Sequence, residues 1–455
     1  MGSFITSALA FVVAISILVA VHEFGHFWVA RKLGIKVLRF SIGFGSPIWR
    51  KVAGKDRVEY VIASIPLGGY VKLLDEREGP VPETDRARAF NRQPVSYRVA
   101  VLVAGPAFNF LFAILAYWLV FSLGVPGLRP VVGEVEPASY AADAGLRKDD
   151  EIIRVGEGTV QTWEHALLAV LDEMLDDGKI PLTVQDSTGA QRSLLIDVRG
   201  QESRLTEPGQ LLTGIGIQQW RPVIPAVIGE IVPGEAGDKA GLLAGDELVA
   251  VDGEPVEDWT HWASLVADRP GQLVRLDVVR AGEQLQLVVA LGETESGGKT
   301  IGRVGAGPEI PAGLYEHMRA EQRFGPVAAL GAGAQKTWDM SLLTLRMLWK
   351  MITGEVSIKN ISGPINIAEY AGYTASAGLV AFLSFLAIVS ISLGILNLLP
   401  IPMLDGGQVV YQVAELAKGS PVSERTQIIG QQIGIVLLIV LMSFAFYNDL
   451  SRLMG

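Results

Sequence analysis

The sequence contains no cysteine among its 455 residues. Disulfide bonds and thiolate metal sites are therefore excluded, and a bound metal would need histidine, aspartate or glutamate ligands. The chain also lacks a basic excess, since its formal net charge is −10. This balance argues against a nucleic-acid partner, because binding phosphates requires basic patches. Only five histidines are present, so a chance cluster of them is improbable.

Apolar residues, in contrast, make up 49% of the chain. Soluble domains are seldom so apolar, and a membrane-crossing helix needs about 20 such residues in a row. Four runs meet this requirement, at 4–33, 99–125, 379–399 and 428–446. The first run has no basic segment before it and no small-residue cleavage site after it, so we interpret it as a retained anchor rather than a signal peptide.

Lysine and arginine are concentrated between the first two runs, where eight of them lie from Arg31 to Arg57. Because cytoplasmic loops carry the basic excess, this first loop is predicted to face the cytoplasm. Both termini and the long region at 126–378 would then lie outside.

That outer region contains an internal repeat. Gly-Glu-Val-Glu-Pro at 133–137 is followed by Ala-Gly-Leu at 144–146, and Gly-Glu-Ile-Val-Pro at 229–233 is followed by Ala-Gly-Leu at 240–242. A constant period of this size predicts two copies of one small domain rather than a solenoid.

Each copy resembles the PDZ family in its circularly permuted bacterial form, and the match is most specific in the second copy, through Ala-Gly-Leu, Gly-Asp-Glu-Leu and Val-Asp-Gly. The resemblance implies an α+β domain that receives a peptide terminus at a strand edge by β-augmentation. The candidate edges are 131–135 and 227–231. An alternative of equal weight is that the domains only exclude bulky substrates.

Residues 317–350 mix charges with tryptophan, methionine and leucine. This composition predicts an amphipathic helix on the membrane surface. The alternative is an ordinary helix packed against a PDZ domain.

The decisive residues form the motif His22-Glu23-Phe24-Gly25-His26 inside the first apolar run. Residues i and i+4 share one face of a helix, so both imidazoles can bind one Zn²⁺ with Glu23 beside it. Ionisable groups inside a span cost about 2.5–3.5 kcal/mol each. Their presence there favours a metal site over the alternative that they only mark a helix end.

The third ligand has one good candidate. His165, His261 and His317 lie in the outer region, whereas Asp405 lies in Asn-Leu-Leu-Pro-Ile-Pro-Met-Leu-Asp-Gly-Gly at 397–407. The prolines break the third span and the glycines allow a tight return, which places this carboxylate on the cytoplasmic side. An isolated aspartate here would be interpreted as a helix N-cap, but the motif on the same side favours a metal ligand.

This set of residues predicts hydrolysis. The metal would keep one position open for a water whose pKa it lowers toward neutrality. Glu23 would take the water proton and later deliver one to the leaving amine. The Asn397 amide would help to stabilise the oxyanion or would orient the substrate.

The two metal motifs, with PDZ repeats between the second and third spans, resemble the site-2 protease family over essentially the whole chain. The resemblance implies an intramembrane zinc metalloprotease of the bacterial inner membrane, with the active site toward the cytoplasm and the PDZ domains and both termini in the periplasm. It also implies that the substrates are transmembrane segments of single-span proteins, typically anti-sigma factors, with remnant signal peptides as a second class. Such cleavage belongs to regulated intramembrane proteolysis and envelope stress signalling.

The segment 39–73 offers a place for an unwound substrate. Residues 40–45 and 58–67 are predicted as hairpin strands and 66–70 as a turn, and the glycines permit close backbone approach. In the resembling family this segment dips into the membrane and pairs with substrate as an added strand. The candidate substrate-binding residues are therefore Gly43, Phe44, Gly45, Gly68, Gly69 and Tyr70, and the alternative is a plain surface hairpin.

A further motif in the second span, Gly-Pro-Ala-Phe-Asn at 105–109, is predicted to allow close helix packing. Asn109 could also form a hydrogen bond to the third span.

The predicted fold is a multi-pass α-helical membrane protein with four transmembrane helices, a membrane-associated β-hairpin and two inserted α+β PDZ domains. The predicted divisions are spans one and two at 1–126, the PDZ domains at 127–220 and 221–308, the surface helix and linker at 309–378, and spans three and four at 379–455. Two rival functions are a membrane scaffold that binds peptide termini and a metal transporter. The scaffold leaves the buried motif without purpose, and the transporter lacks the paired broken helices of inverted repeats.

Overall fold

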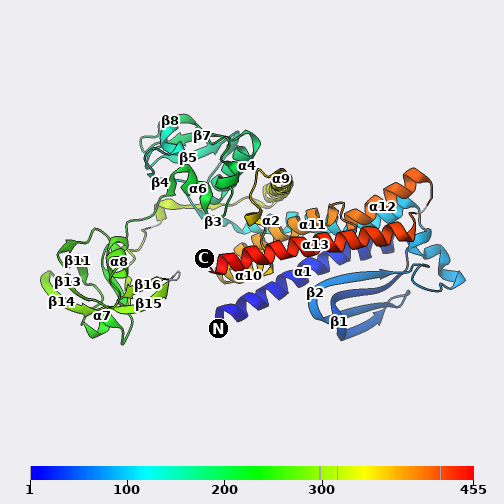
Figure 1. The fold of residues 1–455 in the computed structure, drawn as a ribbon, viewed down its shortest axis with the longest axis horizontal. Helices are drawn as coiled ribbons and strands as arrows, with labels where there is room; N and C mark the ends of the chain where they lie inside the picture. Colours follow the sequence, from blue (N-terminus) through cyan, green and yellow to red (C-terminus); the bar gives the residue numbers. More distant parts are fainter. Residues whose placement is uncertain (1, 297–298, 315, 421, 455) are drawn as a thin grey trace.

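The computed structural model describes every residue except Met1, Gly297, Gly298, Tyr315, Pro421 and Gly455. Within the described part, four helices are long and apolar enough to cross a membrane: α1 Gly2–Lys32, α2 Val95–Leu123, α11 Leu379–Leu398 and α13 Glu424–Met454. They coincide with the four predicted runs, which confirms that prediction. Figure 1 shows these helices running along one another, with both chain termini at the same end of the bundle.

Helix α2 lies at the centre of the bundle and packs against α1, α11 and α9 (Pro326–Thr353). Its contact with α11 is a buried apolar cluster that includes Tyr117, Val120 and Ile391. The last helix, α13, is tied near its C-terminal end to α10 (Pro364–Ala377), because the Asp449 carboxylate accepts hydrogen bonds from backbone N–H groups at the start of α10.

The segment between α1 and α2 forms two long bent strands, β1 Val37–Ala53 and β2 Val58–Leu73. The first half of β1 pairs with both halves of β2, since Phe40 faces Val71 on one side and Tyr60 on the other. The second half of β1 pairs only with the first half of β2. The resulting sheet has residues 65–73 of β2 along one edge, beside α1.

The predicted turn at 66–70 overlaps a reversal within β2, because residues 59–62 rise in register with 39–42 of β1 whereas residues 69–71 pair with 42–40 in the opposite sense. Another reversal lies at 54–57, where Gly54 and Arg57 adopt positive φ angles. The Gly-Gly pair at 68–69 lies at the end of the reversal within β2 and also allows close approach to α1, since a Cβ at Gly69 would lie 2.8 Å from Val19 Cγ1.

The two repeats each form a four-stranded antiparallel sheet of the same topology. The first has the order β6-β5-β7-β8 and the second has the order β12-β11-β13-β14. Each sheet packs on one helix, α4 Trp163–Asp177 or α8 Trp259–Ala267, and each has its own buried apolar core. The bounds of these strands are β5 Glu151–Val155, β6 Gly158–Thr159, β7 Lys179–Gln185, β8 Gln191–Asp197, β11 Glu247–Val251, β12 Glu254–Pro255, β13 Leu273–Arg280 and β14 Glu283–Ala290.

The strand edges predicted to receive a peptide are already paired. Strand β4 (Val132–Val135) pairs with β9 (Ile217–Gln219), and β10 (Ile228–Ile231) pairs with β17 (Ala306–Pro308). Among the described strands, β9 and β17 have no second partner. In these two-stranded pairs the free edge therefore belongs to β9 or β17, which the sequence pattern did not reveal because each lies some 80 residues after the landmark motif.

Smaller elements complete the outer region. Strand β3 Val125–Leu128 pairs with β18 Arg319–Gln322 and β15 Gly292–Ser296 pairs with β16 Lys299–Arg303, and the short helices are α3 Tyr140–Asp143, α5 Glu202–Leu205, α6 Gln210–Ile215 and α7 Ala236–Lys239.

Helix α9 begins at Pro326, later than the predicted start at residue 317, because β18 occupies the preceding residues. The helix packs against the first repeat, where Leu343 joins Leu175 in a buried cluster and Arg346 donates to Asp172. Trp338 and other apolar side chains on α9 remain exposed. The packed-helix alternative is thus correct for one face, and the exposed face is compatible with a membrane surface.

Candidate metal centre

The two histidines of the first span lie on one face of α1, and Asp405 meets them from another element. The His22 Nε2 and His26 Nε2 atoms are 3.2 Å apart. The Asp405 Oδ2 atom lies 3.2 Å from the first and 3.5 Å from the second. Ligands bound tetrahedrally to zinc at about 2.0–2.2 Å are about 3.3–3.6 Å from one another. The three side chains could therefore hold one metal ion.

Close packing of α1 on α2 makes room for the imidazoles. A Cβ atom at Gly25 would collide with the Ala104 carbonyl oxygen, and a Cβ at Gly105 would collide with His26 Nε2 and come within 2.7 Å of His22 Cε1. Small residues allow such close approach between membrane helices. The close helix packing predicted for 105–109 is therefore present, and Gly105 provides the space in which both imidazoles lie.

The outer nitrogen of each imidazole is partnered by α2. The His26 Nδ1 atom lies 2.7 Å from the Val101 carbonyl oxygen, and His22 Nδ1 lies 3.1 Å from the Asn109 side-chain amide. The predicted bond to the third span is present but uses the backbone, because the Ser390 hydroxyl donates to the Asn109 carbonyl oxygen at 2.9 Å. Sequence reasoning missed the contact of Asn109 with His22, although an amide inside a span four residues after a glycine was a signal.

Asp405 is the first residue of α12 (Asp405–Lys418), and Leu404 occupies the N-cap position without a side-chain hydrogen bond. The N-cap alternative for Asp405 is therefore wrong. Residues 399–404 reverse the chain after α11, and glycines permit this because a Cβ at Gly406 would collide with Leu398 and one at Gly407 with Ile401. The Asp405 Oδ2 atom is buried and accepts no hydrogen bond from the described residues, so it is free to bind a cation.

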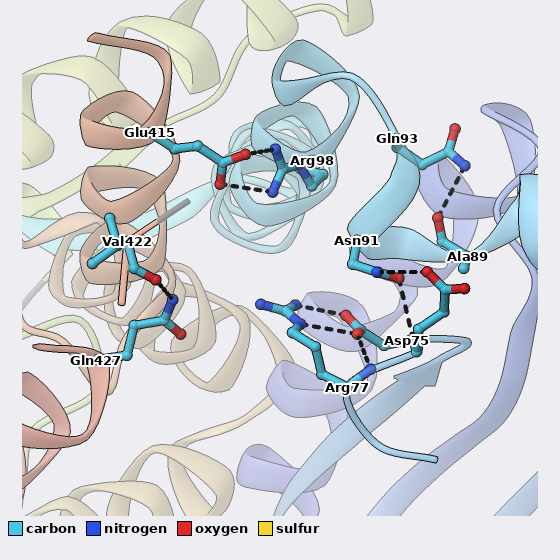
Figure 2. A network of polar contacts seen from close by, with 10 residues as sticks. Asp75, Arg77, Ala89, Asn91, Gln93, Arg98, Glu415, Val422 and Gln427 are labelled. Atoms are coloured by element: carbon cyan, nitrogen blue, oxygen red, sulfur yellow. Dashed lines mark hydrogen bonds and ion pairs between the residues drawn. The ribbon is translucent and has the colours of Figure 1, made fainter. Parts of the chain in front are cut away.

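An ion pair holds the far end of α12 against α2. Figure 2 shows the Arg98 guanidinium donating two hydrogen bonds to the Glu415 carboxylate, at 3.1 and 2.6 Å. Arg98 is buried, and its hydrogen bonds hold the pKa of Glu415 below its usual range. The neighbouring Asp75 and Arg77 form a second bidentate pair at the base of the β1–β2 sheet. Helix α12 is thus fixed to the same helix that packs on His22 and His26.

Glu23 is half-buried between the histidines and the edge of the β sheet. A Cβ atom at Gly69 would lie 3.0 Å from Glu23 Cγ, and the Val71 backbone lies within hydrogen-bonding reach of the Glu23 carboxylate. The edge strand therefore passes directly beside the predicted general base.

The remaining predicted substrate residues surround this edge. Gly43, Gly45 and Gly68 adopt positive φ angles, and a Cβ at Gly68 would collide with the Phe44 ring. The Phe44 and Tyr70 rings stack with centroids 6.2 Å apart. The six residues thus form one continuous surface at the bend of β1 and the edge of β2.

Asn397 lies half-buried in the last turn of α11, and its amide makes no hydrogen bond to the described part of the chain. His165, His261 and His317 lie on α4, on α8 and in the 3-10 helix at Glu316–Met318, and none belongs to the metal cluster.

Comparison with known proteins agrees with this geometry. The model of peptidase family M50 matches residues 10–441. The regulator of sigma-E protease RseP of Escherichia coli K12 is 44% identical over 455 residues, which cover all of both chains. The Vibrio cholerae protein named "Putative zinc metalloprotease" is 42% identical over 447 residues, 98% of each chain, and the Neisseria meningitidis protein NMA0084, named in the same way, is 43% identical over 449 residues, 98% of this chain and 99% of the relative.

Two conclusions follow. The fold and the metal-binding cluster define a membrane-embedded metalloprotease, of the site-2 protease type predicted from the motifs. The chain belongs to peptidase family M50.

Proposed function

We propose that this protein hydrolyses peptide bonds within the membrane-spanning segments of single-span proteins. The observation that carries the proposal is the position of His22, Glu23 and His26 on a helix long enough to cross a membrane, with Asp405 meeting them from α12. Two histidines and a glutamate inside a membrane-spanning helix raise the free energy of its insertion, and a peptidase that acts on soluble substrates would not need them there.

In this proposal His22, His26 and Asp405 hold Zn²⁺ through two imidazole nitrogens and one carboxylate oxygen. Zinc in such a site lowers the pKa of water and polarises a carbonyl group as a Lewis acid. Glu23 takes the proton of the attacking water and returns one to the leaving amine. Its half-buried carboxylate faces both the ligand set and the substrate edge, as this proton transfer requires. Asn397 acts at the same site, on the oxyanion or on substrate orientation.

The substrate is unwound and added as a strand along residues 65–73 of β2. This edge has unpaired backbone groups beside Glu23, and an extended chain can pair with it by β-augmentation. Gly68 and Gly69 allow the added backbone to approach closely, and Phe44 and Tyr70 flank it. Edge pairing would supply the hydrogen bonds that the substrate loses when its helix unwinds in a medium without water.

The relative in Escherichia coli is named for regulation of sigma E. By this likeness, the substrates here are anti-sigma factors of the inner membrane and, secondarily, remnant signal peptides, in envelope stress signalling. The active site would face the cytoplasm and the repeats, as PDZ domains, the periplasm. Cavities of about 460 and 380 Å³ beside β9 and β17 offer peptide grooves in the two repeats, with exclusion of bulky substrates as the alternative role.

The test is cleavage of a single-span substrate in detergent by the wild-type protein and by Glu23→Gln, with the zinc content of both measured. We expect the wild type to cut, and the variant to keep its zinc but to lose cleavage. Equal cleavage by both would overturn the role of Glu23. Absence of zinc and of cleavage in both would overturn the function and favour the scaffold.

A further inference from the structure

Asn109 is a fully buried polar residue in the middle of α2. Its amide nitrogen Nδ2 lies 3.1 Å from His22 Nδ1, and its amide oxygen Oδ1 has no partner among the described residues. The two ends of an amide are interchanged by a half-turn about its last side-chain bond, so the hydrogen bonds decide which end faces His22. A buried amide without full hydrogen bonding is costly, and such groups call for a specific explanation.

The protonation of His22 decides which amide atom faces it. His22 Nε2 points to Asp405 and to His26 Nε2, so Nε2 is the nitrogen placed to bind a metal. A neutral imidazole that ligates through Nε2 carries its proton on Nδ1. The Nδ1–H group is then a donor and needs an acceptor. The amide oxygen of Asn109 is an acceptor, whereas its NH₂ group would place two donors against each other.

His26 provides the comparison within the same site. Its Nδ1 atom lies 2.7 Å from the Val101 carbonyl oxygen, which can only accept. With the Asn109 amide turned so that its oxygen faces His22, both outer nitrogens meet acceptors of α2, one from the backbone and one from a side chain. Asn109 and Val101 both lie on the face of α2 that packs against α1, and α1 runs past them in the opposite direction from His22 to His26.

We infer that Asn109 is a positioning residue for the metal ligand His22: its amide oxygen accepts the Nδ1–H hydrogen bond and thereby fixes the tautomer and ring orientation that direct Nε2 to the metal. This inference rests on the proposed zinc site. Partners of ligating histidines have this role in other zinc sites, and their loss weakens metal binding by about 10–100-fold.

The third span in turn immobilises Asn109. The Ser390 hydroxyl donates to the backbone carbonyl oxygen of Asn109, and a Cβ at Gly394 would lie 3.4 Å from the Asn109 Cβ. Helix α11 therefore packs directly against this residue. Helix α11 leads to the reversal that carries Asp405. Asn109 therefore joins the histidine helix to the helix that precedes the third ligand, and its rotamer is held by packing, as a supporting residue requires.

The experiment measures the zinc dissociation constant by competition with a chelator, on full-length protein in detergent, for wild type, Asn109→Leu and Asn109→Asp. Leucine has a similar volume but no acceptor, and we expect it to weaken zinc binding about 10–100-fold. Aspartate keeps an acceptor oxygen in place, and we expect zinc binding within about threefold of wild type or tighter, since charged acceptors bond more strongly. A merely structural role of the amide would not give this rescue.

Asn448→Leu is the matched control, because Asn448 is a buried asparagine of α13 whose amide donates to the Ile358 and Ile361 carbonyl oxygens, away from the metal cluster. This variant should lose stability but keep the wild-type zinc affinity. If Asn109→Leu does not fold, Asn109→Ser is the second variant. Its side chain is polar but too short to bring an acceptor to His22 Nδ1, so it should show the same loss of zinc affinity.

The inference is overturned if folded Asn109→Leu or Asn109→Ser binds zinc as tightly as wild type, or if Asn109→Asp is as weak as Asn109→Leu. These outcomes differ from failure of the proposed function, in which the wild type itself would bind no zinc.

Discussion

The two repeats and the helix bundle both bury ionisable groups, but they do so in different ways. In the repeats, Asp150 and Asp246 are buried at equivalent positions, 96 residues apart. Each accepts hydrogen bonds from an arginine of the same sheet, Arg192 of β8 or Arg280 of β13, and from the backbone N–H three residues earlier. The buried aspartate recurs at the same place in both repeats and each time pairs with an arginine, far from the metal cluster, so we interpret the pair as stabilising the fold of each repeat.

In the bundle, three polar contacts made by α2 converge on the metal cluster and have no counterpart 96 residues away. Asn109 contacts His22, Val101 partners His26, and the Arg98–Glu415 pair holds the helix that carries Asp405. The comparison teaches that a buried polar group should be interpreted from two observations: whether it recurs at equivalent positions of a repeat, and whether its contacts meet those of other polar groups at one place. Repetition indicates architecture, and convergence on one point indicates a site. The predictions below test this distinction, from the largest expected effect to the smallest.

Replacing Gly105 by alanine should abolish the metal site. The added Cβ would collide with His26 Nε2 and press on His22 Cε1, so both ligands must move. A displacement near 1 Å at a catalytic group costs on the order of 100-fold in rate, and we expect loss of zinc as well as of cleavage. Gly331→Ala on α9 is the control, since a Cβ there meets nothing within 4 Å; it should keep both properties. Wild-type zinc binding by Gly105→Ala would refute the convergence argument.

Breaking the Arg98–Glu415 pair should have an intermediate effect. Arg98→Met leaves the Glu415 carboxylate without its donors, and we expect the free energy of unfolding to fall by about 1–3 kcal/mol. Zinc affinity should fall less than in Gly105→Ala, because the histidines stay in place and only the hold on α12 is lost. Unfolding and chelator competition on Arg98→Met, Glu415→Gln and the double variant test this.

The double variant should show a coupling of about 0.5–3 kcal/mol. Additive effects of the two substitutions would mean that the pair does not act as a unit.

Asp246→Asn should destabilise the second repeat by about 1–3 kcal/mol and leave zinc affinity and cleavage of a single-span substrate unchanged. Asp150→Asn should do the same in the first repeat. Unfolding followed by the fluorescence of the tryptophan residues and zinc titration measure the two properties separately. A loss of zinc affinity in either variant would break the proposed separation between the repeats and the bundle.

The same pair predicts a dependence of stability on pH. Burial acts to raise the pKa of Asp246, but the hydrogen bonds and charge of Arg280 together with the Leu243 N–H outweigh it, and the pKa is lowered from the ordinary value of 3.8. The stabilisation is therefore present above the unfolded pKa and is lost as the pH falls through the lower folded pKa. Acid unfolding of the second repeat should shift to higher pH in Arg280→Gln.

The smallest effect is expected for the exposed pair between Arg303 and Glu235. Water screens such pairs, so Arg303→Gln should change neither unfolding nor zinc binding measurably. A marked loss of stability would mean that exposed pairs also hold the second repeat together.

Much of the molecule followed from local patterns. The four spans follow from hydropathy, because a helix in a membrane needs an uninterrupted run of apolar residues and such a run can be read directly from the sequence. The two-copy organisation follows from the 96-residue period. The metal ligands on α1 were predictable because i and i+4 lie on one face of any helix. The strand edges of the repeats were not predictable, because pairing of β4 with β9 joins segments far apart in the chain.

By itself, therefore, the sequence determined the class of chemistry: two histidines and a glutamate at helical spacing inside an apolar run, with an aspartate in a proline-broken motif. Only the tertiary structure decided how these groups are held. The contact of Gly105 with the imidazoles, the partner of His22 on α2 and the passage of β2 beside Glu23 all join elements whose separation in sequence carries no distance information. Such contacts depend on the packing of whole helices, and no local pattern encodes them.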